Sequence, residues 1–391
     1  MTKLLSTSRR VEQMQAPVIA QVGALLAAHP RAISLGQGVP SYGPPVALLA
    51  RAVTPEEDPS RHRYQPGDGM LELQAVWRAV IAEENGIGLE QGDMIVTAGS
   101  NMAFLQLMAV VADPGAQVIL PLPYFFNQRM ALEILGIEPV LVATDHAFQL
   151  DPERIAAAVT AKTRAIVTVS PNNPTGAVYP EAALKQINEL CAARGLIHVS
   201  DEAYQHFVFE GATHFSPASV SGAEAHTITL FSLSKSYGIA GWRVGCALVP
   251  RRLMHDVRKV QDTNLICAPV PSQRLAAVLL AEGSEWRKAK VAQIAALRQP
   301  LIRALAAMSA LLEAPVTEGA FYFMLRLPRT GPDMPLVERL IREHGIALIP
   351  GSAFGAGPQM HLRLAYGALT RASLDDAMAR LRQGLSAARW V

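Results

Sequence analysis

An apolar run that stops in a hydroxyl-rich loop decides how this chain is interpreted: residues 229–245, TLFSLSKSYGIAGWRVG. The apolar start predicts a strand, and Lys235 stands where the strand has ended and a loop begins, a common position for chemistry in an α/β protein. Ser232, Ser234 and Arg243 supply two hydroxyls and a fixed cation, which together suit a phosphate. A phosphate clamp beside a lysine indicates a pyridoxal phosphate site, because that cofactor's aldehyde forms a Schiff base with a lysine amine.

The size and composition fit a globular protein with two or three domains. The chain has 391 residues, of which 50% are hydrophobic and 17% charged, so it can bury a large core. The formal net charge of +2 predicts no strong attraction to nucleic acid or to anionic membranes. Three scattered cysteines without metal-ligand spacing indicate a reducing compartment, and no stretch has transmembrane length or signal-peptide character. We therefore expect a soluble cytoplasmic protein with no metal, nucleic-acid or membrane partner.

Short apolar runs alternate with helical stretches through the middle of the chain. This alternation predicts a mostly parallel sheet with helices on both faces. Functional residues are then expected at the carboxyl ends of the strands, where loops such as 170–176 and 201–204 follow. The predicted strands are residues 95–97, 117–120, 139–142, 165–169, 196–199 and 227–231.

The residue composition and the pattern of predicted elements change near residue 272. A long Ala/Leu/Arg-rich tract predicts helix to about residue 312, and short strands follow around 321–327 and 361–364. This pattern predicts a second, smaller α+β domain that the N-terminal segment joins. The expected organisation is an N-terminal arm with part of the small domain (1–45), a large cofactor-binding domain (46–271) and a C-terminal small domain (272–391).

Three polar residues at strand ends can serve the ring of the cofactor. A carboxylate must keep the pyridine nitrogen protonated, and Asp201, directly after a predicted strand, is the candidate. A buried carboxylate stays ionised only when it is paired, and a pyridinium is such a partner. Taken alone, an aspartate at a strand end is more often a helix N-cap. Asn173 and Tyr204, at neighbouring strand ends, can donate an amide and a phenol hydrogen to the ring oxygen.

Two further segments can contact the cofactor. Tyr124, in a Pro-X-Pro-Tyr loop, can stack on the ring face, although such a loop is also an ordinary place for a packed tyrosine. Gly99, Ser100 and Asn101 form a turn between a strand and a helix, whose N–H groups and helix dipole make an anion cradle. Alone, this turn is a weak signal, because many strand-to-helix connections carry a glycine.

Two features suit a substrate carboxylate. Arg363 lies on a predicted strand of the second domain and can bind a carboxylate through two parallel hydrogen bonds. The loop at 36–40 presents backbone N–H groups with a low profile, which also suits a carboxylate. Without other context, the arginine is more often a surface residue and the loop an ordinary turn.

Four motifs in this order resemble those of the class I/II aminotransferases of fold type I: residues 170–176 (SPNNPTG), 201–204 (DEAY), 232–235 (SLSK) and 241–245 (GWRVG). The resemblance covers nearly the whole chain. It implies a large domain with a mostly parallel seven-stranded sheet flanked by helices, plus a smaller α+β domain. It also implies a pyridoxal 5'-phosphate-dependent aminotransferase (EC 2.6.1.-) that moves an amino group between an L-amino acid and a 2-oxoacid by a ping-pong mechanism.

The resemblance gives each site residue a role. Lys235 forms the Schiff base and shuttles the proton, and Asp201 binds the pyridine nitrogen. Asn173 and Tyr204 hold the ring oxygen. Arg363, with Asn173 and the backbone at Gly38, binds the substrate. The remaining cofactor contacts implied are Tyr124 on the ring and Ser232, Ser234, Arg243 and the Gly99–Ser100–Asn101 turn on the phosphate.

The resemblance also bears on assembly and specificity. Tyr64 matches a tyrosine that in this family reaches the phosphate from the other subunit, which implies a homodimer with shared sites. Asn101 stands where aspartate-specific members often carry a lysine for the distal carboxylate. A neutral amide cannot pair with that charge, so strict aspartate specificity is not expected. Val39 and the neighbouring loop, with Phe321 and Tyr322, favour an apolar or aromatic pocket.

Other readings of the same motifs stay open. A β-lyase, cyclase or oxidase acting on an amino acid would need the same Lys235, Asp201 and Arg363, so the motifs do not separate these reactions from transamination. A transcription-regulator domain or a homologue without turnover is a non-enzymatic alternative. The near-neutral charge and the retained Lys235 argue against it.

Overall fold

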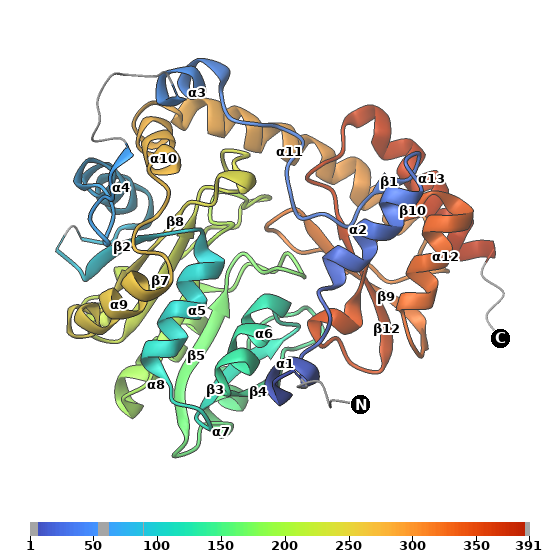
Figure 1. Cartoon of the computed structure of the whole chain (residues 1–391). Coiled ribbons are helices and arrows are strands. Elements are labelled where there is room, and N and C mark those ends of the chain that lie inside the picture. Colours follow the sequence, from blue (N-terminus) through green and yellow to red (C-terminus); the bar gives the residue numbers. More distant parts are fainter. Residues whose placement is uncertain (1–6, 54–61, 89, 388–391) are drawn as a thin grey trace, which may run out of the picture.

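The largest element of this computed structural model, which describes residues 7–53, 62–88 and 90–387, is a seven-stranded sheet (Figure 1). The spatial order is β2–β8–β7–β6–β5–β3–β4, and only β8 runs antiparallel to its neighbours. The mostly parallel sheet predicted from the alternating pattern is confirmed. Its strands are β2 (Asp93–Thr97), β3 (Gln117–Leu122), β4 (Glu138–Ala143), β5 (Thr163–Val169), β6 (Ile197–Asp201), β7 (Thr227–Ser232) and β8 (Gly245–Val249).

Helices cover both faces of this sheet. Successive residues of a strand point to opposite faces, and on β2 the side chains of Met94 and Val96 join a core cluster with α4 and α10, whereas Ile95 joins the main core with α5. Within the described ranges, no helix combines the length and apolarity needed to cross a bilayer. The helices around the sheet are α4 (Leu71–Asn85), α5 (Ser100–Val111), α6 (Phe126–Leu135), α7 (Pro152–Ala157), α8 (Glu181–Arg194), α9 (Arg251–Asn264) and α10 (Val270–Glu282).

A smaller α+β part lies beside the large sheet. Its three strands form an antiparallel sheet in the order β11–β12–β9. The helical tract predicted from residue 272 is two helices, α10 and α11, and α11 extends from the large sheet to the small one (Figure 1). The elements of this part are α11 (Ser284–Ala306), β9 (Tyr322–Thr330), α12 (Met334–His344), β11 (Ile349–Pro350), β12 (Gln359–Ala365) and α13 (Arg371–Ala387).

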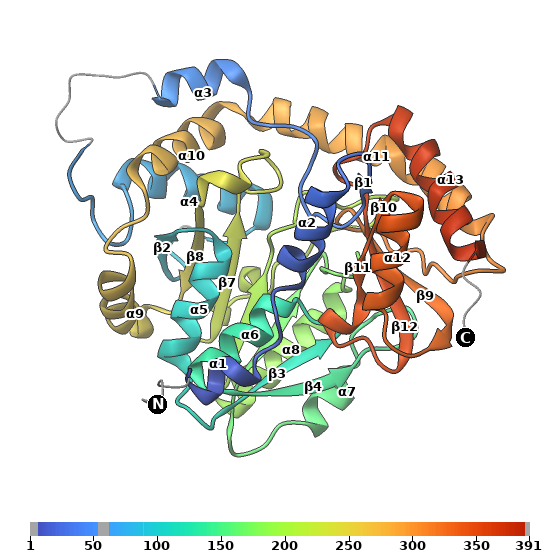
Figure 2. The same cartoon turned by 45° about the vertical axis from the view of Figure 1, so that its right-hand side comes forward.

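The N-terminal segment runs across both parts (Figure 2). Helix α1 (Arg9–Gln13) lies against α6, and α2 (Val18–Ala28) packs on α12 and β11. Strand β1 (Ile33–Ser34) pairs in parallel with β10 (Ile346–Ala347), and α3 (Val46–Val53) returns to α10. The loop after β1 is thereby held between the two parts. The domain boundaries at 45/46 and 271/272 stay a prediction.

Candidate active site

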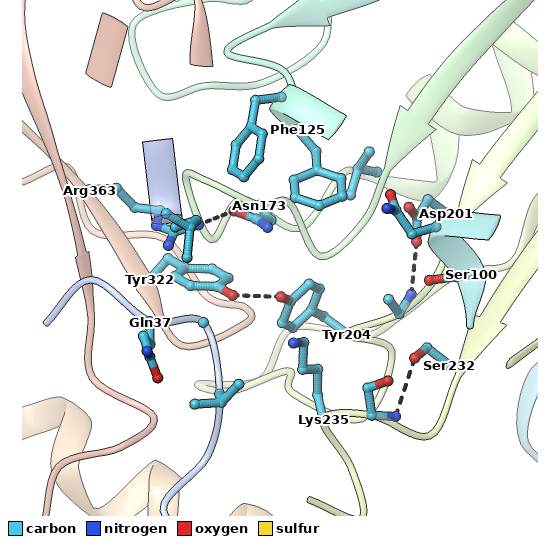
Figure 3. A pocket seen from close by; sticks show the side chains of 18 of the residues that line it. Gln37, Ser100, Phe125, Asn173, Asp201, Tyr204, Ser232, Lys235, Tyr322 and Arg363 are labelled. Carbon is cyan, nitrogen blue, oxygen red and sulfur yellow. Dashed lines mark hydrogen bonds between the residues drawn. The ribbon is translucent and has the colours of Figure 1, made fainter. Parts of the chain in front are cut away.

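One cavity lies where the carboxyl ends of β5, β6 and β7 face the small sheet. Its volume is about 450 Å³, and its walls also include the start of α5, the loop after β1, and residues of β9 and β12 (Figure 3). The topology explains the site, because the carboxyl ends of parallel strands meet at one edge of a sheet. The predicted site residues that line the cavity are Gly38, Ser100, Asn101, Asn173, Asp201, Tyr204, Ser232, Ser234, Lys235, Arg243 and Arg363.

Lys235 follows β7 and directs its amine into the cavity beside Tyr204 (Figure 3). Burial lowers the pKa of Lys235 to about 8, and the positive charges of Arg363 and Arg243 act in the same direction. A lysine with a lowered pKa is neutral in a larger fraction of molecules at neutral pH, and only the neutral amine can attack a carbonyl or accept a proton.

Asp201 ends β6 at the opposite end of the cavity from Arg363 (Figure 3). Its carboxylate accepts hydrogen bonds from Gln128 Nε2 at 3.0 Å and from the Ala203 backbone N–H at 3.2 Å. Burial raises the pKa of Asp201 to about 6, and the nearby negative charge of Glu202 contributes to the rise. Among the described residues no cation pairs with Asp201, so the carboxylate suits a positively charged group of a ligand.

Arg363 lies on β12 and is only 2% exposed. Its Nη1 donates to Asn173 Oδ1 at 2.9 Å and its Nη2 to the Gly36 carbonyl at 2.5 Å. The guanidinium also lies 4.7 Å from the ring centre of Tyr322, while its buried Nε has no hydrogen-bond partner in the described part of the chain. A buried donor without a partner is costly, and a carboxylate entering the cavity would satisfy it.

Asn173 and Tyr204 are both fixed by hydrogen bonds to neighbouring side chains. Because Asn173 turns its Oδ1 to Arg363, its amide hydrogens remain for another acceptor. The Tyr204 hydroxyl lies 2.5 Å from the Tyr322 hydroxyl, and both phenols are buried. Burial raises the pKa of Tyr204 well above its ordinary value, so its hydroxyl stays protonated and can act as a donor.

The predicted phosphate residues surround the start of α5. Arg243 adopts φ +51° and donates to the backbone carbonyls of Ala240 at 2.8 Å and Ala98 at 3.3 Å, which fixes the guanidinium beside the helix. Ser100 and Asn101 open α5, and the N–H groups of the first helical residues have no intrahelical acceptor. The Gly99 N–H is already bonded to the Thr97 carbonyl at 2.8 Å. Gly99 is therefore not an N–H donor to the phosphate, contrary to prediction.

The expectation for Tyr124 requires a correction. Tyr124 does not line the cavity; its hydroxyl accepts a hydrogen bond from Arg129 Nη1 at 2.6 Å and its ring contacts that guanidinium. Phe125 and Phe126 line the cavity instead. The motif located the right turn, but the backbone direction at the end of the loop decides which of three consecutive aromatic side chains enters the site.

Tyr64 and Gln128 lie outside the predicted set of residues that line the cavity. Tyr64 is 78% exposed and is not part of the cavity wall of this subunit. Gln128, which the sequence did not single out, reaches Asp201 from the first turn of α6. Its position three residues after Phe125 places both on one side of the helix start, a spacing that could have indicated it.

The comparisons with known proteins agree with this geometry. The family model for aminotransferase class I and II matches residues 30–381. The chain belongs to this family. Its members depend on pyridoxal phosphate, so this protein is a pyridoxal phosphate-dependent aminotransferase of fold type I.

Several members of the aminotransferase family resemble the chain over nearly its full length. The aromatic aminotransferase ISS1 of Arabidopsis thaliana is 33% identical, with 97% of this chain and 96% of that protein covered. The structure of the aspartate aminotransferase of Thermus thermophilus with maleate is 30% identical, with a TM-score of 0.87 and coverage of 97% and 100%. The aromatic aminotransferase of Pyrococcus horikoshii is also 30% identical, with a TM-score of 0.84 and coverage of 93% and 98%.

The side chains of the cavity fit the cofactor. Asp201 is a buried carboxylate without a cation, as a protonated pyridine nitrogen requires, and Lys235 is a buried amine with a lowered pKa. Two N–H groups at a helix start, with serine hydroxyls and Arg243, suit a phosphate.

Proposed function

We propose that this aminotransferase uses Lys235 as the group that moves the proton during transamination. When bound, pyridoxal phosphate supplies an electron sink that makes the Cα hydrogen of an amino acid acidic. The Lys235 amine would take up that proton from the substrate Cα and deliver it to the C4′ carbon of the cofactor, and its pKa of about 8 places it near the ideal for a base at neutral pH.

The other cavity residues bind and orient. Asp201 pairs with the protonated ring nitrogen, while Asn173 and Tyr204 donate to the ring oxygen. Arg363 binds the substrate α-carboxylate, assisted by the backbone at Gly38. The observation that carries this assignment is a buried carboxylate and a buried arginine at opposite ends of the cavity, each without a counter-ion in the described chain, with Lys235 between them (Figure 3).

The remaining residues bind the phosphate of the cofactor or cover the face of its ring. Ser232, Ser234 and Arg243 bind the phosphate together with the free N–H groups at the start of α5. Ser234 already donates its backbone N–H to Ser232 Oγ at 3.2 Å, which holds the Ser232 hydroxyl beside Ser234. Phe125, in place of Tyr124, covers the ring face, because its side chain lies on the cavity wall.

We infer that the amino donor has a neutral, apolar or aromatic side chain. Ile19, Val39, Phe125 and Phe126 contribute apolar surface to the cavity. Its cations in the described chain are Lys235, Arg243 and Arg363, and each has another task in this assignment; the helix start carries Asn101 rather than a cation. Two similar proteins are named aromatic aminotransferases, which agrees with the inference, whereas others are named aspartate or aspartate/prephenate aminotransferases.

We further propose a homodimer in which Tyr64 completes the phosphate site of the partner subunit. Tyr64 is 78% exposed, and Val46 and Leu71, which are 80% and 76% exposed, are large apolar side chains that water does not favour. An interface over these residues would bury them. A cytoplasmic location and a role in amino-acid biosynthesis stay predictions from the sequence.

A comparison of amino donors tests the proposed function. The purified enzyme with pyridoxal phosphate is mixed with one amino acid at a time, and the loss of the cofactor's visible absorbance and its return on adding pyruvate or 2-oxoglutarate are followed. Phenylalanine, leucine or methionine should react at least about tenfold more efficiently than aspartate, because the described cavity wall offers no further cation to neutralise a second carboxylate.

An engineered cation provides the matched comparison. Asn101→Lys should raise the efficiency with aspartate relative to phenylalanine, since it places a positive charge at the start of α5. A wild-type enzyme that prefers aspartate would contradict the substrate class. Release of pyruvate and ammonia with no absorbance change that an oxoacid reverses would contradict transamination.

A further inference from the structure

Tyr322 forms a hydrogen-bonded pair with Tyr204 across the cavity wall. Tyr204 follows β6 of the large sheet, whereas Tyr322 begins β9 of the small one, and their hydroxyl oxygens lie 2.5 Å apart (Figure 3). The exposed fractions are 4% for Tyr204 and 0% for Tyr322. The two rings meet edge to face, with centres 5.4 Å apart.

A phenol has one hydrogen to donate, so only one hydroxyl of this pair can donate to the other. We propose that Tyr322 is the donor and therefore a positioning residue: it leaves the single Tyr204 hydrogen directed into the cavity, towards the ring oxygen of the cofactor. If Tyr204 donated to Tyr322 instead, it would have no hydrogen left for the cofactor. This inference rests on the proposed role of Tyr204.

The charges around the pair favour this direction. The Arg363 guanidinium lies over the Tyr322 ring at 4.7 Å, and its positive charge opposes the rise in the pKa of Tyr322 that burial causes. Arg363 acts on the pKa of Tyr204 in the same direction, but the hydrogen bond of the pair raises the pKa of Tyr204 and lowers that of Tyr322. The hydroxyl of the more acidic phenol is the better donor. The other charged groups near Tyr204 are Asp201 at the end of β6 and Lys235 after β7, both on the large-sheet side. A donated hydrogen bond also strengthens the next one in a chain of hydroxyls.

Gly38 fixes the position of the Tyr322 hydroxyl. A Cβ atom at Gly38 would overlap that hydroxyl, so only glycine allows the loop after β1 to pass so closely. Tyr322 therefore contacts three parts of the site: the loop at Gly38 that is proposed to hold the substrate carboxylate, the Arg363 guanidinium and the Tyr204 hydroxyl. This arrangement links the substrate subsite to the cofactor's ring oxygen.

The test measures the pH midpoint of the visible absorbance change of the bound cofactor. Tyr322→Phe should raise this midpoint by about 0.5–1 pH unit, because a weaker donor at Tyr204 leaves the ring oxygen more basic. Tyr204→Phe should raise it at least as far. The double variant should match Tyr204→Phe alone, since Tyr322 acts only through Tyr204.

Two further variants separate positioning from general destabilisation. Tyr366→Phe removes an equally buried hydroxyl, bonded to Arg298 at 2.9 Å outside the cavity, and should leave the midpoint unchanged even if the protein is less stable. Gly38→Ala displaces the Tyr322 hydroxyl without removing the ring and should reproduce the upward shift, which keeps the proposal testable if Tyr322→Phe does not fold. Added to Tyr322→Phe, it should shift the midpoint no further.

The outcomes distinguish this inference from the proposed function. A midpoint that moves in Tyr204→Phe but stays at the wild-type value in Tyr322→Phe would overturn the inference and leave the role of Tyr204 intact. A midpoint that moves in neither variant would contradict both. An equal shift in Tyr366→Phe would show that lost stability, not donor direction, causes the effect, and would also overturn the inference.

Discussion

At the scale of single residues, Asp201 shows how a buried carboxylate depends on its ligand. Its pKa is 3.8 ordinarily and about 6 in the folded chain without cofactor. The folded chain therefore binds this proton more tightly than the unfolded chain does. The stability that Asp201 contributes is fully present below pH 3.8 and is lost as the pH rises through about 6. Above that pH the cofactor-free protein holds an unpaired buried charge.

This loss of stability with rising pH leads to a prediction for Asp201→Asn. The amide resembles the protonated acid, so the cofactor-free variant at pH 8 should be more stable than the wild type by about 1–3 kcal/mol. The gain should disappear near pH 4, and it should reverse when pyridoxal phosphate is bound, because the variant then lacks the partner of the ring nitrogen. Urea unfolding of both proteins at both pH values, with and without cofactor, measures this. A less stable variant in the cofactor-free form at pH 8 would refute the argument.

Some residues of the site could be predicted from the sequence, and others could not. Lys235, Asp201 and Arg363 were placed in one predicted site because the set of motifs as a whole resembles a known family, whereas Asp201 and Arg363 alone would each suit an ordinary structural role. Tyr124 was misassigned because residue spacing does not tell which side chain of an aromatic triplet faces a cavity. Gln128 was missed, since its spacing from Phe125 is a weaker signal than a motif and becomes informative only when Asp201 is seen beside it.

At the scale of elements, the turn before α5 depends on a glycine for two reasons. Gly99 has φ +85°, and a Cβ atom there would lie 2.5 Å from Arg243 Nη2. Gly99→Ala should therefore displace Arg243, the arginine proposed to bind the phosphate, and lower the affinity for pyridoxal phosphate by about 10- to 100-fold. Titration of the cofactor-free protein with pyridoxal phosphate, with inorganic phosphate as competitor, measures the loss.

Gly115 provides the control for that variant. It has nearly the same φ, +86°, but a Cβ atom there would meet nothing within 4 Å. Gly115→Ala should lose a similar amount of stability through backbone strain while keeping its affinity for the cofactor. If both variants bound the cofactor equally well, Gly99 would be only a strained turn.

Elements were easiest to predict where the pattern is regular. The six strands read from apolar runs all exist, with ends that differ by a few residues. Strand β8 was not among the predicted strands, and its first residue, Gly245, is the last residue of the motif at 241–245. Gly245 allows β8 to lie close to the start of α5, since a Cβ atom at this position would lie 2.7 Å from the Ser100 backbone nitrogen. Composition alone does not distinguish such a glycine from one in a turn.

At the scale of the whole molecule, the fold class followed from the alternation of strands and helices, but the long-range pairings did not. The pairing of β1 with β10 joins residues more than 300 positions apart, and it places the loop at Gly38 against Tyr322. Local periodicity carries no information on such a contact, because it indicates which face of an element is buried but does not identify the element that packs against that face. The family resemblance placed Gly38 and Arg363 at one substrate carboxylate, but it did not predict the pairing of β1 with β10.

The exposed Tyr64 gives a prediction for the assembly. If Tyr64 completes the partner's phosphate site, a subunit with Lys235→Ala and one with Tyr64→Ala are defective in different halves of the same site. Each variant alone should be inactive or, for Tyr64→Ala, should lose its cofactor at low pyridoxal phosphate. Mixed and allowed to exchange subunits, they should form hybrid dimers in which one site has both native residues and the other has neither, so activity at low cofactor should return.

The control for subunit exchange mixes each variant with itself under the same conditions, which should restore nothing. A second control mixes Lys235→Ala with Asp201→Ala: both residues lie in the cavity of one subunit, so neither site of a hybrid dimer is complete and no activity should return. Recovery confined to the Tyr64 pair would establish that each site is shared between subunits. If hybrid dimers form but stay inactive, Tyr64 serves its own subunit or none, and its exposure must be explained by another contact.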